Sequence, residues 1–167
     1  MTPPPFIRMG EWQALKSEGI IRTLLGSCIG LALYDRRHCV AGLAHIVLPS
    51  SRGTTEAPGK FVDTAVPTLI HAMNQLVRGT LRPTARIVGG ANMFATEIAD
   101  AIGAQNIAAS ERVLSEMRIP IVGRHCGGEQ GRKVTIDVGS GLITIEMVGG
   151  EATRMPDQPP RSGVPND

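Results

Sequence analysis

The chain has 167 residues, 42% hydrophobic and 19% charged, which is typical of one globular domain with a buried core. Its net charge of +2 comes without a block of lysine or arginine and with few aromatic residues, so nucleic-acid binding is not expected. No window approaches the roughly 18 consecutive apolar residues of a membrane span. The first residues lack the basic and apolar segments of a secretory signal. We therefore expect a cytoplasmic protein without membrane insertion.

The amino-terminal part contains one expected strand. Residues 1–9 include three consecutive prolines, which cannot supply ladder hydrogen bonds, so this segment is expected to be extended and loosely held. Residues 10–21 are expected to form an early strand that leads into a turn at Thr23.

Two apolar segments of strand length, residues 23–34 and 39–49, flank a polar four-residue connection and predict a β-hairpin. If residues 34 and 39 close the loop, Cys28 lies directly opposite His45, with Cβ atoms roughly 4.5–5.5 Å apart. Such a pair can act as nucleophile and base, because histidine can hold cysteine as its thiolate. A one-residue slip would separate the two side chains. The alternative is that both are buried structural residues.

Gly26 and Ser27 immediately precede the thiol. Glycine allows the close backbone approach and unusual dihedral angles that a nucleophile turn with exposed N–H groups requires. Such N–H groups can stabilise a negatively charged oxygen. The sequence therefore predicts an oxyanion-binding turn at Gly26 and Ser27, beside Cys28.

A helix is expected after residues 50–59, which have the composition of a loop that either walls the Cys28 pocket or is simply solvated. Apolar residues between Val62 and Val77 recur at helical spacing. Asp63 is a suitable N-cap, and Gly79 can end the helix.

The remaining elements follow in order. A short buried strand is expected at 85–88, a short helix at 94–102 that Gly103 stops, a second helix at 106–118 and a strand at 119–122. Residues 133–138 and 142–148 predict a closing hairpin across a Gly-Ser-Gly turn.

The overall pattern predicts an α+β fold: layered β-sheets of mainly antiparallel hairpins with flanking helices. Residues 1–150 form a single domain in this interpretation. Residues 151–167 are rich in proline and nearly lack large apolar side chains, so they are expected to be a disordered tail.

The three cysteines show no C-x-x-C spacing, so a disulfide framework is not indicated. Two His-Cys pairs, His38-Cys39 and His125-Cys126, raise the question of a zinc site. Neighbouring residues on a strand point to opposite faces, so neither pair easily supplies two ligands. No metal site and no cofactor are expected.

Several ordered motifs, beginning with Thr-Leu-Leu-Gly-Ser-Cys at 23–28 and Gly-Leu-Ala-His-Ile-Val-Leu-Pro at 42–49, together resemble the chemoreceptor glutamine deamidases, the CheD family. The resemblance covers roughly residues 10–149. Several motifs in the same order are together more specific than any one of them. The matching segments are Thr-Leu-Leu-Gly-Ser-Cys at 23–28, Gly-Leu-Ala-His-Ile-Val-Leu-Pro at 42–49, Pro-Gly-Lys-Phe-Val-Asp-Thr-Ala at 58–65, Gly-Gly-Ala-Asn-Met-Phe at 89–94, Ile-Gly-Ala-Gln-Asn at 102–106, and Gly-Gly at 127–128 with Gly-Arg-Lys-Val at 131–134.

The resemblance implies a cysteine hydrolase that converts glutamine to glutamate in the cytoplasmic domain of bacterial chemotaxis receptors. Cys28 would attack the side-chain amide as a thiolate and form a thioester, and His45 would move the protons. The resemblance also suggests hydrolysis of receptor glutamyl methyl esters and binding of a CheC-type phosphatase. The implied fold is akin to the catalytic domain of deamidating bacterial toxins.

The resemblance leaves the third catalytic residue open. In much of the family a threonine six residues before the cysteine orients the histidine, whereas here Arg22 stands at that position and Thr23 at five. We favour Thr23, and Ser27 is the alternative. Two other classes of function remain at this stage: a cysteine amidohydrolase acting on another protein, and a non-catalytic interaction module of the chemotaxis pathway.

Overall fold

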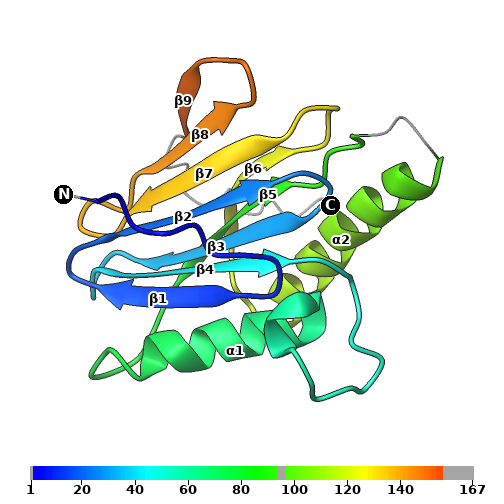
Figure 1. Ribbon diagram of the computed structural model, residues 1–167. Helices are drawn as coiled ribbons and strands as arrows, with labels where there is room; N and C mark the ends of the chain where they lie inside the picture. Colours follow the sequence, from blue (N-terminus) through cyan, green and yellow to red (C-terminus); the bar gives the residue numbers. More distant parts are fainter. Residues whose placement is uncertain (1, 94–96, 156–167) are drawn as a thin grey trace, which may run out of the picture.

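The structure is a computed structural model that describes residues 2–93 and 97–155 as three stacked layers: two α-helices, a five-stranded sheet and a four-stranded sheet (Figure 1). This is the predicted α+β class. The elements in chain order are β1 (Trp12–Lys16), β2 (Ile20–Leu25), β3 (Ile29–Asp35), β4 (Val40–Ile46), the 3₁₀ turn η1 (Pro58–Lys60), α1 (Val62–Asn74), β5 (Thr84–Gly89), α2 (Glu97–Glu116), β6 (Ile121–Cys126), β7 (Arg132–Asp137), β8 (Ile143–Met147) and β9 (Ala152–Met155).

The larger sheet has the strand order β1-β4-β3-β5-β6, and the smaller sheet has the order β2-β7-β8-β9. Neighbouring strands are antiparallel except for β5 and β6, which are parallel. Both helices cover one face of the larger sheet, and the smaller sheet covers the other (Figure 1). All seven residues of β3 and of β4 are therefore buried.

Alternate residues of these central strands enter two separate cores, as the two-residue period of a strand requires. One core lies under the helices and contains Leu31, Ala44 and Leu69. The other lies between the sheets and contains Ala32, Leu43 and Val134. Cys28 belongs to this second, inter-sheet core.

The expected early strand is wrong, because β1 and β2 are two strands in different sheets. The chain changes sheet between them at Ser17 and Gly19, which have φ angles of 71° and 122°. It changes back at residues 26–28, between β2 and β3. Thr23 consequently lies within a strand and not at a turn, and the predicted strand 23–34 is interrupted beside Cys28.

Helix α1 is confirmed, with small differences at its ends. Its N-cap is Phe61, and Asp63 lies in the first turn, where its carboxylate accepts hydrogen bonds from the backbone N–H and the hydroxyl of Ser51 at 2.9 Å each. The helix ends at Asn74, before Gly79.

The two expected helices around Gly103 are one helix, α2, which runs through that glycine. A Cβ at position 103 would lie 2.7 Å from the carbonyl oxygen of Gly90, so glycine here permits close packing and does not stop the helix. Residues 94–96, where the first of those helices was expected to begin, lie outside the described residues.

Both chain ends are more ordered than expected within the described residues. Ile7 is 9% exposed and bridges to Thr23, so the amino-terminal segment is not loosely held there. The expected tail is wrong for residues 152–155, which form β9 and pair with β8. The rest of the expected tail, residues 156–167, lies outside the described residues. No described helix is long and apolar enough to cross a membrane.

The helix–sheet core predicts a clear difference between two leucines. Leu69 of α1 is fully buried against Gly42, whereas the side chain of Leu24 on β2 is 53% exposed. Leu69→Ala should lower the free energy of unfolding by about 2–5 kcal/mol, because it leaves a cavity in the core. Leu24→Ala should change it by less than about 0.5 kcal/mol. Urea titrations of both variants give the measurement, and equal losses would contradict the assigned packing.

Candidate active site

The predicted site residues meet on the face of the larger sheet that packs against the smaller sheet. Thr23 is completely buried, His45 is 5% exposed and Cys28 is 9% exposed. His45 follows Leu43 by two residues on β4, and Cys28 precedes Gly30 of β3 by two. The even residues of β3 and the odd residues of β4 line the inter-sheet core, so Cys28 and His45 share this face.

The predicted register is wrong by two residues. His45 pairs with Gly30, and the hairpin closes at Asp35 and Val40. The carboxylate of Asp35 sets this turn by accepting hydrogen bonds from the His38 and Arg82 backbone N–H groups, at 3.2 and 2.8 Å. A shift of two residues preserves the face, whereas a shift of one would not.

The residue opposite His45 is consequently a glycine that sequence reasoning missed. Directly opposed residues on one face have Cβ atoms only about 4.5–5.5 Å apart. A side chain at Gly30 would therefore stand beside the imidazole, and its Cβ would also lie 2.8 Å from Cδ1 of Leu25. Gly30 therefore leaves room on the inter-sheet face for the side chain of Leu25.

Hydrogen bonds from the loop after β5 hold the residues around Cys28. Gly90 N–H donates to the Cys28 carbonyl and Ala91 N–H donates to the Gly26 carbonyl, both at 3.0 Å. The end of β5 lies so close to the Cys28 backbone that a Cβ at Gly89 would be 2.3 Å from the Cys28 carbonyl oxygen. Gly89 also has a φ of 110°. Position 89 therefore requires glycine.

Thr23 links the two sheets through a hydrogen-bond chain. Its Oγ1 lies 2.7 Å from Nδ1 of His45 and donates to the Ile7 carbonyl at 2.8 Å. A hydroxyl has one proton, which Thr23 donates to the carbonyl, so Thr23 must accept a hydrogen bond from Nδ1–H of His45. This assigns the tautomer of a neutral ring, whose Nε2 then carries the free lone pair.

Of the two hydroxyls that the sequence left open, Thr23 is therefore the one bonded to His45. Within the described part of the chain, Ser27 makes no hydrogen bond with the imidazole. Arg22, which precedes Thr23, stacks on Phe6 at 4.0 Å and donates to the Pro4 carbonyl at 2.6 Å.

The electrostatics favour a neutral pair, not the expected thiolate and imidazolium. Burial raises the pKa of the Cys28 thiol, and burial lowers the pKa of His45, although the Ile7 carbonyl and the Glu11 carboxylate act in the opposite direction on His45. The expectation that His45 and the turn hold Cys28 as a thiolate is therefore wrong for this structure. Both groups are neutral near pH 7.

The backbone N–H groups of Gly26, Ser27 and Cys28 have no acceptor among residues 2–93 and 97–155. Unpaired N–H groups beside a nucleophile are the donors that an oxyanion hole requires. The predicted turn is therefore present as a bend between β2 and β3, with its donors available.

Arg132 is a second residue that sequence reasoning missed. It is only 2% exposed and pairs with Leu25 across β2 and β7. Its guanidinium donates to Nδ1 of His125 at 2.9 Å and to the carbonyls of His125 and Gly127. Burial and the Arg132 cation both lower the pKa of His125, which keeps that ring a neutral acceptor.

The loop that Arg132 holds supports the Cys28 segment. Gly127 N–H donates to the Gly89 carbonyl at 2.9 Å, and Asn92 N–H donates to the Gly128 carbonyl at 2.8 Å. The loop after β5 thus joins the Arg132 loop to Cys28. The Gly-Gly and Gly-Arg motif at 127–132 was the only sequence signal, and it gave Arg132 no role.

The described residues contain no group of three or more histidine, cysteine or acidic side chains placed to hold a metal ion. The three cysteines are all free.

Comparison with known proteins agrees with the sequence motifs. The family model described as CheD chemotactic sensory transduction matches residues 47–147, a span that begins after Cys28 and His45. A Thermotoga maritima protein named chemoreceptor glutamine deamidase CheD is 37% identical over 145 residues, which cover 86% of this chain and 92% of that protein. Proteins named probable chemoreceptor glutamine deamidase CheD from Clostridium botulinum (strain Eklund 17B) and Methanococcus vannielii are 44% and 40% identical, over 86% and 83% of this chain and 92% of each relative.

The raised thiol pKa predicts slow chemical modification of Cys28. The thiolate is the reactive form, and a raised pKa means that it becomes abundant only at higher pH than for an ordinary cysteine. At pH 7, iodoacetamide should modify Cys28 more slowly than half-buried Cys39, and the Cys28 rate should still be rising above pH 9.

Mass spectrometry of the cysteine peptides over time gives these rates, and the urea-unfolded chain, with all three cysteines exposed, is the control. Modification of Cys28 ahead of Cys39 at pH 7 would contradict the neutral pair and restore the thiolate that the sequence predicted.

Proposed function

Because the chain belongs to the CheD chemotactic sensory transduction family, we propose that it is a protein-glutamine glutaminase that converts glutamine side chains of chemoreceptors to glutamate. The observation that carries the proposal is the 2.7 Å hydrogen bond between Thr23 and His45, on the face that Cys28 shares. This bond fixes the orientation of a neutral imidazole, whose Nε2 can then act as a base. The substrate class comes from the names of the relatives.

Catalysis begins with proton transfer and attack in one event. Cys28 is protonated at rest, so Nε2 of His45 removes the Sγ proton as the sulfur attacks the amide carbon of the glutamine side chain. The carbonyl π electrons move to oxygen. The backbone N–H groups of Gly26, Ser27 and Cys28 stabilise that oxyanion, at typically about 2.7–4 kcal/mol per donor.

His45 then acts as an acid. The imidazolium returns its Nε2 proton to the amide nitrogen, the carbon–nitrogen bond breaks, and ammonia leaves behind a thioester with Cys28. In the second half, neutral His45 activates water, which attacks the thioester carbon and releases glutamate and the thiol. Throughout, Thr23 accepts the hydrogen bond from Nδ1–H and donates its own hydrogen bond to the Ile7 carbonyl, which holds the ring in one orientation.

The direct experiment incubates receptor cytoplasmic fragments with the protein and follows glutamine-to-glutamate conversion by peptide mass spectrometry. Cys28→Ala should fold normally and abolish conversion, because no other described residue replaces the sulfur nucleophile. Cys39→Ala and Cys126→Ala are the matched controls and should retain most activity. Full conversion by Cys28→Ala would overturn the mechanism.

The hydrogen-bond chain gives a separate prediction for Thr23. Thr23→Val keeps the shape of the buried side chain but frees the ring, so kcat should fall by about 10- to 100-fold, less than on loss of Cys28. KM should change little. Thr135→Val, on β7 and paired with Arg22, and Ser27→Ala serve as controls with near wild-type rates. A crippled Ser27→Ala beside a fully active Thr23→Val would reverse the assignment of the third residue.

The same residues suit the other activities that the resemblance suggested. Methyl ester hydrolysis would proceed through the same thioester with methanol as leaving group, and methanol release from methylated receptor fragments tests it. A CheC-type phosphatase as regulator is tested by measuring conversion with and without that protein.

The same mass-spectrometry assay, run with unrelated glutamine peptides as well as receptor fragments, separates the rival functions. A cysteine amidohydrolase with another target would deamidate unrelated glutamine peptides as well as receptor fragments. A non-catalytic module would convert neither.

A further inference from the structure

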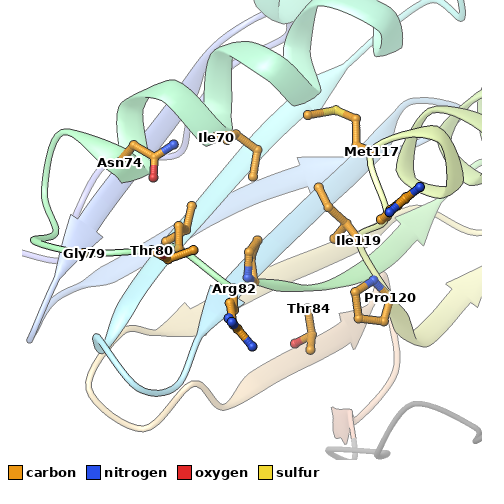
Figure 2. A pocket seen from close by; sticks show the side chains of 12 residues that line it. Ile70, Asn74, Gly79, Thr80, Arg82, Thr84, Met117, Ile119 and Pro120 are labelled. Carbon is orange, nitrogen blue, oxygen red and sulfur yellow. The ribbon is translucent and has the colours of Figure 1, made fainter.

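A second concave site lies at the end of the molecule opposite Cys28. Strand β5 runs from Thr84, which borders a cavity of about 560 Å³, to Gly89, which lies against the Cys28 carbonyl. The cavity is bordered by three segments: the second half of α1, the connection between α1 and β5, and the connection between α2 and β6 (Figure 2). Its size falls within the usual range for small-ligand sites, roughly 300–1,000 Å³.

The floor of this cavity is apolar and its edge is polar. Ile70 points from α1 toward the space that Thr80 and Ile119 border from the other sides (Figure 2). Leu81, Met117 and Pro120 add apolar surface, whereas the hydroxyls of Thr80 and Thr84 and the amide of Asn74 supply hydrogen-bonding groups. Such a combination binds a ligand with an apolar body and a few polar substituents.

Two guanidinium groups and no carboxylate line the cavity. Both Arg82 and Arg118 are exposed, and neither side chain has a hydrogen-bond or ion-pair partner among the described residues. The nearby carboxylate of Asp35 is buried and already accepts hydrogen bonds from His38 and the Arg82 backbone. Among the described residues, no carboxylate that lines the cavity pairs with these two guanidinium groups.

The backbone fixes the positions of both arginines. Arg82 is held by its N–H bond to Asp35 at 2.8 Å. Arg118 lies just after the end of α2 and has a φ of 57°, a left-handed position that usually carries glycine. The Ile119 N–H closes this helix end by donating to the Leu114 carbonyl at 2.9 Å.

Further arginines raise the positive potential here. Arg37 lies in the β3–β4 turn and Arg78 in the connection after α1, and both are exposed. These two segments meet, because a Cβ at Gly79 would lie 3.8 Å from Nε2 of His38. Arginines that are scattered through the sequence thus gather at one end of the fold, where they attract anions.

We propose that this cavity binds a small organic anion: an apolar or aromatic body on Ile70, Leu81 and Ile119, with a carboxylate, sulfonate or phosphate group on Arg82 and Arg118. Guanidinium groups bind such oxygens through charge-assisted hydrogen bonds. The site is distinct from the Cys28 site and does not depend on the function proposed for it.

The test compares two fluorescent probes of similar shape: 8-anilinonaphthalene-1-sulfonate, which is anionic, and N-phenyl-1-naphthylamine, which is uncharged. The full-length protein should bind the anionic probe with one site, and the double variant Arg82→Gln/Arg118→Gln should weaken it by about tenfold or more. Binding of the uncharged probe should change less than twofold. The control Arg52→Gln/Arg154→Gln makes the same change in net charge on exposed residues away from the cavity and should leave both affinities unchanged.

The location of the anionic probe is read from backbone amide chemical shifts in the wild-type protein, which needs no variant to fold. Shifts centred on Gly79, Thr80 and Thr84 support the proposal. Shifts centred on Met93 and Val148 near the Gly26 bend, or equal weakening by both double variants, overturn it. An acidic peptide that binds these residues when the anionic probe does not would assign the cavity to a protein partner and would also overturn the proposal.

Discussion

The fold around the candidate site depends on one buried hydrogen bond, from Nδ1–H of His45 to Oγ1 of Thr23. It joins β4 of the larger sheet to β2 of the smaller sheet, in a core otherwise filled by apolar side chains. An unpaired hydroxyl or imidazole there would cost about 1–3 kcal/mol. The Ile7 carbonyl completes the chain by accepting a hydrogen bond from the Thr23 hydroxyl. The same bond that satisfies two buried polar groups therefore also fixes the imidazole for proton transfer.

The position of Cys28 follows from the change of sheet at residues 26–28. A chain that passes between two layers cannot continue a ladder, so its N–H groups are released from pairing just where the thiol stands. The carbonyls of Gly26 and Cys28 are instead satisfied by the loop after β5, which the Arg132 loop supports. Burial between the two sheets raises the pKa of the thiol and lowers the pKa of the imidazole, so both groups are neutral. For this reason the proposed mechanism transfers the thiol proton during the attack.

The two ends of β5 have different chemistry. At Gly89 the strand meets the Cys28 segment in a buried setting, and at Thr84 it borders a cavity lined by Arg82 and Arg118, whose side chains have no partner among the described residues. The Asp35 carboxylate lies at the Thr84 end, where it accepts hydrogen bonds from the His38 and Arg82 backbone N–H groups. The cavity and the candidate site therefore lie at opposite ends of the same strand, β5.

The sequence alone determined the residue types and their faces. Strand period two placed Cys28 and His45 on one face, and this held despite the register error because the error was two residues. The helical stripe of α1 and the hairpin of β7 and β8 were also predictable, since both depend on local spacing and turn chemistry. The continuous helix through Gly103 was not predictable, because the reason for that glycine is the distant carbonyl of Gly90.

Tertiary structure decided the rest. Asp35 accepts a hydrogen bond from Arg82, 47 positions away, and the partner of Thr23 depends on two strands of different sheets meeting. Such contacts follow from packing between layers and leave no periodic trace in the chain. The protonation of Cys28 is the clearest case, because the sequence supplied a neighbouring base, but the depth of burial determined the charge.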